Sequence, residues 1–96
     1  MTAYLLVDLD VQDKEGFERY KNEVPALIAK HGGEYLIRGG EFEVIEGDWQ
    51  PSRLVLFSFP DRGAIRAFFD DPSYAELKVL RHRTANSIVV AIDGVD

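Results

Sequence analysis

Three short runs of the chain are rich in aliphatic and aromatic residues, and each predicts a β-strand. They are Tyr4–Leu9, Arg53–Phe59 and Ser87–Ile92. Side chains in a strand point alternately to the two faces of the sheet. In all three runs apolar residues occupy both sets of alternate positions, so both faces of the predicted sheet are apolar.

A fourth strand, Glu34–Arg38, lies between two glycine pairs. The second pair, Gly39–Gly40, predicts a bulge and not a reversal, because a strand-like run resumes over Phe42–Glu46. We therefore expect one long, bent strand. It ends at a polar loop over Gly47–Ser52, which makes a hairpin connection to the next strand.

A helix is predicted between the first two strands by apolar residues spaced three and four apart. Asp13 is a suitable N-cap residue, and Gly32 is a suitable stop because glycine tolerates the left-handed conformation. Pro25 lies inside the pattern, so we expect a kink near Asn22–Val24 or a new start at Pro25. The apolar face comprises Phe17, Tyr20, Val24, Leu27, Ile28 and His31.

Two shorter helices are predicted before the last strand. Asp61 is the expected cap of the first, which carries an apolar face that ends at Phe69. Asp71 as N-cap and Pro72 at the first position begin the second helix, and Asn86 is expected to end it. The residues that share one face of the second helix are Tyr74, Leu77, Lys78 and Arg81.

The predicted order of elements is β-α-β-β-α-β. It indicates an α+β fold, with a four-stranded antiparallel sheet and the helices on one face. An antiparallel sheet whose other face meets water normally alternates apolar and polar residues, and a large exposed apolar face is unusual in a monomer. We therefore predict a homodimer in which the uncovered faces of two sheets meet across a two-fold axis.

The composition is that of one globular domain, over residues 1–96, with 46% hydrophobic and 29% charged residues. The net charge of -6 argues against nucleic-acid binding, because an acidic chain repels the phosphate backbone. No apolar run approaches the roughly 20 residues of a membrane span, and the N-terminus lacks a basic start. We therefore expect a cytoplasmic protein that does not bind membranes. Without cysteine, the chain has no disulfide and no thiol nucleophile.

Several short motifs are spaced along nearly the whole chain. They are Phe17, Tyr20 and Pro25, His31–Gly33, Tyr35–Gly40, Glu46–Trp49, Pro51, Arg53, Phe59–Pro60, Pro72–Tyr74 and Arg81. Together they resemble the domain of unknown function 1330 family, within the dimeric α+β barrel superfamily. The resemblance implies a ferredoxin-like subunit and a barrel-like dimer. It implies no particular reaction, because the superfamily includes cofactor-independent monooxygenases, lactone isomerases and haem-dependent enzymes.

The chain contains no nucleophile elbow, phosphate-binding loop or HExxH motif. Two histidines are too few for a three-histidine zinc site, and we expect neither a metal nor a cofactor. His31 is the best candidate for a general base or ligand contact, because it lies on the apolar helix face just before the terminating glycine. Alternatively, its ring packs against the helix end and satisfies the last carbonyl groups.

Arg38, Tyr74 and Arg81 are the other predicted ligand-binding residues. Arg38 precedes the glycine pair, where a bulge could turn its side chain into a cleft to pair with a carboxylate. The alternative for Arg38 is an ion pair with Glu41 or Glu46. Tyr74 and Arg81 lie seven residues apart on one helix face. They either line the same pocket or form a structural pair in the core.

Glu46, Trp49 and Arg53 are predicted to contact the second subunit, because they lie around the hairpin loop. An exposed tryptophan in a loop is often buried at an interface, and stacking on a substrate is the alternative for Trp49. Two functions remain open. The first is binding of a small organic molecule, neutral or anionic, in a cleft between helices and sheet, with proton transfer or cofactor-free oxidation as its chemistry. The second is a non-catalytic module whose arginines stabilise the dimer.

Overall fold

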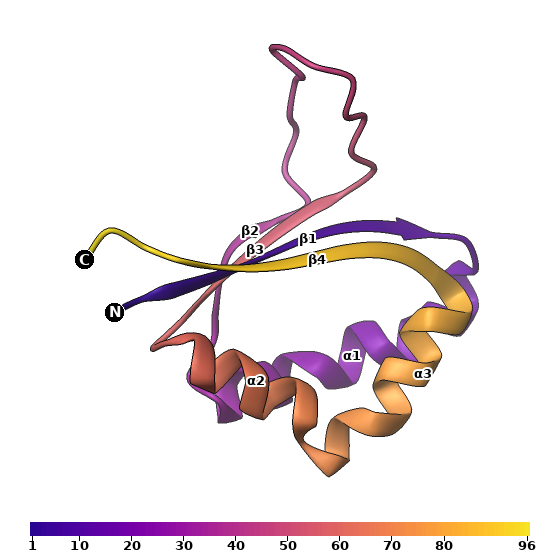
Figure 1. Cartoon of the computed structure of the whole chain (residues 1–96). Helices are drawn as coiled ribbons and strands as arrows, with labels where there is room; N and C mark the ends of the chain where they lie inside the picture. Colours follow the sequence, from indigo (N-terminus) through magenta and orange to yellow (C-terminus); the bar gives the residue numbers. More distant parts are fainter.

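The computed structural model describes residues 1–96 as one sheet covered by helices on one side (Figure 1). Four antiparallel strands are arranged in the order β2-β3-β1-β4. This arrangement confirms the predicted α+β class. None of the helices is both long enough and apolar enough to cross a membrane. The elements are β1 (Ala3–Val11), α1 (Lys14–Lys30), β2 (Glu34–Arg38), β3 (Leu54–Phe59), α2 (Arg62–Asp70), the 3-10 turn η1 (Pro72–Tyr74), α3 (Ala75–Thr84) and β4 (Ala85–Asp93).

The core lies between the helices and the helix-facing side of the sheet. Strand pairing places Leu5 of β1 beside Phe57 of β3 on this side. The ring of Phe68, from α2, packs against this side of the sheet. The centroid of the Phe68 ring lies 4.4 Å from that of Tyr74 and 6.2 Å from that of Phe59. Leu5, Phe59, Phe68 and Tyr74 are each at most 2% exposed. Three of these side chains, Leu5, Phe68 and Tyr74, also line the candidate site.

The opposite face of the sheet carries no helix (Figure 1). Leu6 of β1 pairs with Leu56 of β3 and with Val90 of β4, so these three side chains share the uncovered face. Ile88 and Ile92, two positions either side of Val90, are 57% and 59% exposed. The uncovered face is therefore apolar across three neighbouring strands, as the sequence predicted.

Helix α1 begins and ends at the residues that the sequence predicted. The Asp13 carboxylate accepts a hydrogen bond from the Gly16 N–H at 3.0 Å. The N–H of Gly32, where φ is 78°, bonds to the Ala29 carbonyl at 3.0 Å in a left-handed helix stop. The helix runs without a break through Pro25, so a new start there, one of the two expected alternatives, does not occur.

The second half of the chain differs from the expectation at two junctions. Pro72 begins a short 3-10 turn, and the α-helix itself starts only at Ala75. Asn86 does not end the helix, which stops at Thr84, and Asn86 belongs to β4. The reason is that β1 extends to Val11, and its last residues pair with the first residues of β4.

Residues 39–53 leave the sheet and form a loop that rises from its uncovered side (Figure 1). We refer to it as the projecting loop. The strand predicted over Phe42–Glu46 is wrong, because β3 begins only at Leu54 and leaves a prolonged β2 without an antiparallel partner. The irregularity in β2 also falls earlier than expected, between Tyr35 and Ile37. The turn out of the sheet occurs at Gly39, where φ is 73°.

Candidate functional site

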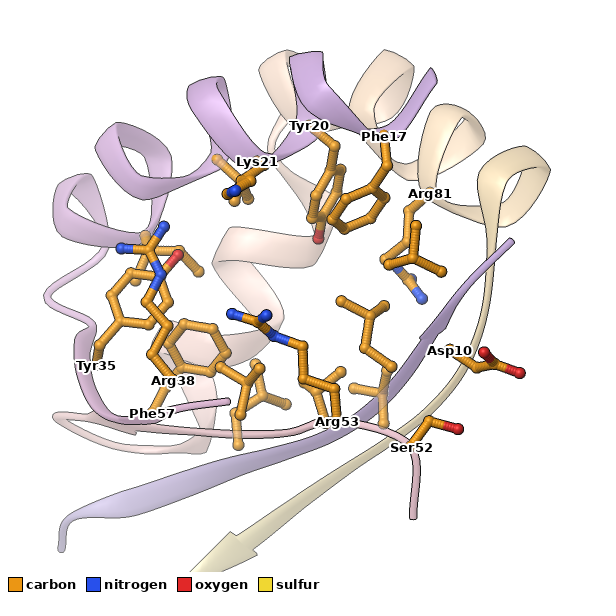
Figure 2. A pocket seen from close by; sticks show the side chains of 18 of the residues that line it. Asp10, Phe17, Tyr20, Lys21, Tyr35, Arg38, Ser52, Arg53, Phe57 and Arg81 are labelled. Carbon is orange, nitrogen blue, oxygen red and sulfur yellow. The ribbon is translucent and has the colours of Figure 1, made fainter. Parts of the chain in front are cut away.

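A cavity of about 530 Å³ opens between α1 and the helix-facing side of the sheet (Figure 2). Fifteen of its 23 lining residues are hydrophobic. Phe17 and Tyr20 approach it from α1, whereas Tyr35 and Phe57 approach it from the sheet. The volume falls within the range of roughly 300–1,000 Å³ that is usual for small-molecule sites. The cavity is thus large enough for an organic ligand of moderate size.

Basic side chains collect around this cavity although the whole chain is acidic. Five basic and two acidic residues line it, in a chain whose net charge is -6. None of these five basic side chains forms an ion pair, since none of their nitrogens lies within 4.0 Å of a carboxylate oxygen. A concave, positively charged surface with apolar walls attracts anions. The basic residues are Lys14, Lys21, Arg38, Arg53 and Arg81, and the acidic ones are Asp10 and Glu18.

Arg38, at the end of β2, and Arg53, the last residue of the projecting loop, extend into the cavity (Figure 2). Arg38 pairs with Val55, which is buried on the helix-facing side, and its guanidinium carbon lies 4.5 Å from the centre of the Tyr35 ring. Arg53 lies across Gly39, where an added Cβ would be 2.6 Å from the guanidinium carbon of Arg53. Because Gly39 has no side chain, the side chain of Arg53 can pass over it and enter the cavity.

Replacing Gly39 with Ala should displace Arg53 and destabilise the protein. The left-handed φ of 73° at this position makes a Cβ unfavourable by about 1–2 kcal/mol, and the clash moves Arg53 out of the cavity. Urea denaturation measures the first effect, and anion titration measures the second. Gly40→Ala is the matched control, because nothing lies within 4 Å of its added Cβ. Equal stability of the two variants contradicts this account of Gly39.

Tyr74 and Arg81 meet at the buried end of the cavity. The Arg81 Nε donates to the Tyr74 hydroxyl at 3.3 Å, and the hydroxyl oxygens of Tyr74 and Tyr20 are 2.8 Å apart. Burial, and then the neighbouring Tyr74, raise the pKa of the Tyr20 hydroxyl well above its ordinary value. Tyr20 therefore keeps its proton at neutral pH and is able to donate a hydrogen bond.

His31 lies away from the cavity, at the C-terminal end of α1. Its Nε2 is 2.8 Å from Oδ2 of Asp71, and its ring stands edge-on to Phe68 with the centroids 6.2 Å apart. The same carboxylate oxygen accepts a hydrogen bond from Lys30 Nζ at 2.8 Å. These contacts tie α1 to the turn before α3. The ring packs as in the structural alternative for His31, but its hydrogen bond goes to Asp71 and not to a helix carbonyl. A ligand role for His31 stays a prediction.

Asp71 should make stability depend on acid pH. Hydrogen bonds from Lys30 and then His31 hold the pKa of its carboxyl well below the ordinary 3.8. A carboxyl whose pKa is lowered by folding stabilises the protein above its unfolded pKa and loses that contribution as the pH falls. We expect the free energy of unfolding to decline between about pH 5 and pH 2, and to decline less in Asp71→Asn.

Chemical denaturation at a series of pH values measures this slope. The matched control is Asp70→Asn, which removes the neighbouring, exposed carboxylate and should keep the wild-type slope. If all three proteins share one slope, the Asp71 contacts do not carry the pH dependence.

Trp49 and Asp8 hold the base of the projecting loop against the uncovered face. The indole Nε1 donates to Asp8 Oδ2 at 3.1 Å, and Asp8 Oδ1 accepts from the Ser52 N–H at 2.9 Å. Trp49 remains 49% exposed, and Glu46 is exposed without an ion pair. Both lie in the loop on the side of the predicted subunit contact, which stays a prediction. Arg53, predicted for the same contact, points into the cavity instead.

Arg53 and Tyr20 were missed as cavity residues by the sequence analysis. For Arg53 the signal was present, because it lies two positions before Val55 in a strand-like run and so on the same side. Tyr20 was assigned to the apolar face of α1, and no sequence pattern shows that its hydroxyl meets that of Tyr74. No group of three or more His, Asp or Glu side chains converges anywhere on the chain.

Solved structures resemble the whole chain at low sequence identity. A protein of unknown function from Rhodopseudomonas palustris aligns with a TM-score of 0.78 and 16% identity, covering 99% of this chain and 83% of that one. SnoaB, a cofactor-independent oxygenase from Streptomyces nogalater, aligns with a TM-score of 0.69 and 14% identity, covering 99% and 94%. A dimeric ferredoxin-like protein of unknown function from Jannaschia aligns with a TM-score of 0.64 and 15% identity, covering 98% and 100%. These likenesses show the ferredoxin-like fold and nothing finer.

No curated protein sequence matches the chain. The family described as Domain of unknown function (DUF1330) matches residues 2–95, which is almost the full length. This match confirms the resemblance that the spaced motifs indicated. The chain belongs to the DUF1330 family.

Proposed function

We propose that this protein binds a small organic anion with an apolar body in the cavity between α1 and the sheet. The observation that carries the proposal is the set of five basic side chains that line the cavity without a carboxylate partner. Arginines that serve only packing are normally paired when they converge, because like charges repel. A bound anion supplies the missing negative charge.

The walls of the cavity support an organic ligand over an inorganic one. Most lining residues are hydrophobic, and burying apolar ligand surface against them contributes roughly 25 cal/mol for each Å². An inorganic anion leaves that surface exposed. The planar guanidinium groups of Arg38, Arg53 and Arg81 suit a carboxylate, which they can bind through two parallel hydrogen bonds.

Two probes of the same shape test this proposal. Naphthalene-2-carboxylate and naphthalene-2-carboxamide differ in charge but hardly in size. We expect the carboxylate to bind at least about tenfold more tightly in isothermal titration calorimetry. Arg38→Gln and Arg53→Gln should each weaken its binding and the salt dependence of that binding. Lys78→Met, at an exposed position of α3 outside the cavity, should bind as the wild type does. Equal affinity for both probes, or no binding of either, contradicts the proposal.

A homodimer joined by the uncovered sheet faces is also part of the proposal. Leu6, Leu56 and Val90 give each subunit a continuous apolar surface, and the related protein from Jannaschia is described as dimeric. Arg38 and Arg53 lie on the opposite, helix-facing side of the sheet. Their position favours a ligand-binding role over the alternative in which arginines hold the two subunits together.

A catalytic role is the second candidate: cofactor-free oxidation, by dioxygen, of a bound molecule that ionises at carbon. The fold likeness to SnoaB and the pair of phenols from Tyr20 and Tyr74 support it, because such a pair can hold a proton beside a substrate. Dioxygen uptake with indane-1,3-dione, an apolar carbon acid, measures this activity. Uptake that requires the protein and falls in Tyr20→Phe supports oxidation, whereas uptake no faster than in buffer rejects it for this class of substrate.

A further inference from the structure

The basic residues of the cavity differ sharply in their access to water. Arg38 and Arg53 are exposed at its mouth, as are both lysines, whereas Arg81 is only 6% exposed. Ion pairs of exposed groups contribute little to binding or stability, because water screens the charges. A buried charge without a partner is strongly unfavourable. Of the five basic residues, Arg81 is therefore the one at which a ligand's charge changes the energy most.

None of the partners of Arg81 in the chain is a carboxylate. Its Nε donates to the Tyr74 hydroxyl, one terminal nitrogen donates to the Ser87 hydroxyl, and the other lies 3.4 Å from Nε2 of His82. A guanidinium carries five N–H donors, so two remain without an acceptor. Arg81 is thus a buried cation that has spare donors and no counter-ion.

The phenol of Tyr20 adds a donor at the same end of the cavity. Tyr74 is 1% exposed, and its oxygen accepts from Arg81, so its own proton needs an acceptor. The Tyr20 oxygen, 2.8 Å away, is the acceptor in reach. The proton of Tyr20 is then free to bond elsewhere, and its hydroxyl points into the cavity (Figure 2).

We propose that Arg81 and Tyr20 together bind the charged end of the ligand, and that this end is the carboxylate of a monocarboxylic acid with an apolar body. The inference rests on the proposed function and adds the ligand class and the binding point. One buried cation balances one negative charge, so a singly charged carboxylate fits better than a phosphate ester, which carries close to two. The flat carboxylate also matches the flat guanidinium. Arg38 and Arg53 attract the ligand at the mouth without fixing it.

Calorimetric titration of the full chain with naphthalene-2-carboxylate and with 2-naphthyl phosphate tests both parts. The wild type should bind the carboxylate at least about tenfold more tightly than the phosphate. Tyr20→Phe should weaken carboxylate binding by about tenfold or more, since it removes a hydrogen bond to a charged group. It should leave the weak binding of naphthalene-2-carboxamide unchanged within about threefold.

Arg81→Lys keeps the charge but loses the planar fork, and it should also weaken carboxylate binding by about tenfold. Circular dichroism checks that this variant folds, and Tyr20→Phe keeps the test valid if it does not. Tighter binding of the phosphate, or a larger loss in Arg38→Gln than in Tyr20→Phe, overturns the inference but leaves anion binding in place. Absence of any anion binding by the wild type overturns the proposed function itself.

Discussion

Replacing Val90 with Glu should convert the protein from a dimer into a monomer. Val90 is 47% exposed in the single chain, so a carboxylate there remains solvated and leaves the subunit fold intact. In the proposed dimer the same position is covered by the second sheet. A buried charge without a partner destabilises by about 3–5 kcal/mol, and the two-fold axis applies the change twice.

Sedimentation at micromolar concentration measures this effect. The wild type should have twice the chain mass of 10.9 kDa, and Val90→Glu should have the chain mass itself. The control is Val79→Glu, because Val79 is 62% exposed on α3, away from the uncovered sheet face, and this variant should stay dimeric. A monomeric wild type, or a dimeric Val90→Glu, rules out an interface through the uncovered face.

Replacing Phe68 with Ala should have the largest effect on stability. The ring is 1% exposed, and it packs against Tyr74, Phe69 and Phe59 at centroid distances of 4.4, 5.0 and 6.2 Å. Truncation of such a ring to alanine typically lowers the free energy of unfolding by about 3–5 kcal/mol. Phe68 also lines the cavity. The space that its ring leaves therefore merges with the cavity, and neighbouring side chains do not fill it.

Urea denaturation measures the free energy of unfolding of Phe68→Ala and of the control Phe42→Ala. The comparison separates the effect of losing core packing from that of losing any aromatic ring. Phe42 lies in the projecting loop and is 46% exposed, so its removal should change the free energy of unfolding by no more than about 0.5 kcal/mol. Comparable losses in the two variants mean that the ring of Phe68 does not hold the core as described.

Strands β1, β3 and β4 and both ends of α1 followed from local physical chemistry, because the residues that decide them are neighbours in sequence. Gly32 stops α1 through its own backbone freedom, and Asp13 caps the helix by accepting from an N–H group three residues later. The strand expected over Phe42–Glu46 failed for a different reason. A strand needs a neighbour to accept its hydrogen bonds, and a run of suitable side chains does not show whether one is present.

The candidate site was predicted in part. Arg38, Tyr74 and Arg81 all line the cavity, because strand alternation and helix periodicity place side chains on faces. His31 lies on the expected helix face, yet Asp71, 40 residues later, binds it outside the cavity. Such a partner is set by how α1 and the turn before α3 pack together, and no local pattern records it.

Binding of an organic anion in the cavity is tested most directly by NMR, through titration of the isotope-labelled protein with naphthalene-2-carboxylate. The resonances of the Arg81 Nε–H and of the backbone amides of Val55 and Phe57 should all shift and saturate, and their shifts should follow one binding curve with one dissociation constant. Shifts confined to exposed charges such as Lys78, or shifts that never saturate, contradict a built anion site between α1 and the sheet.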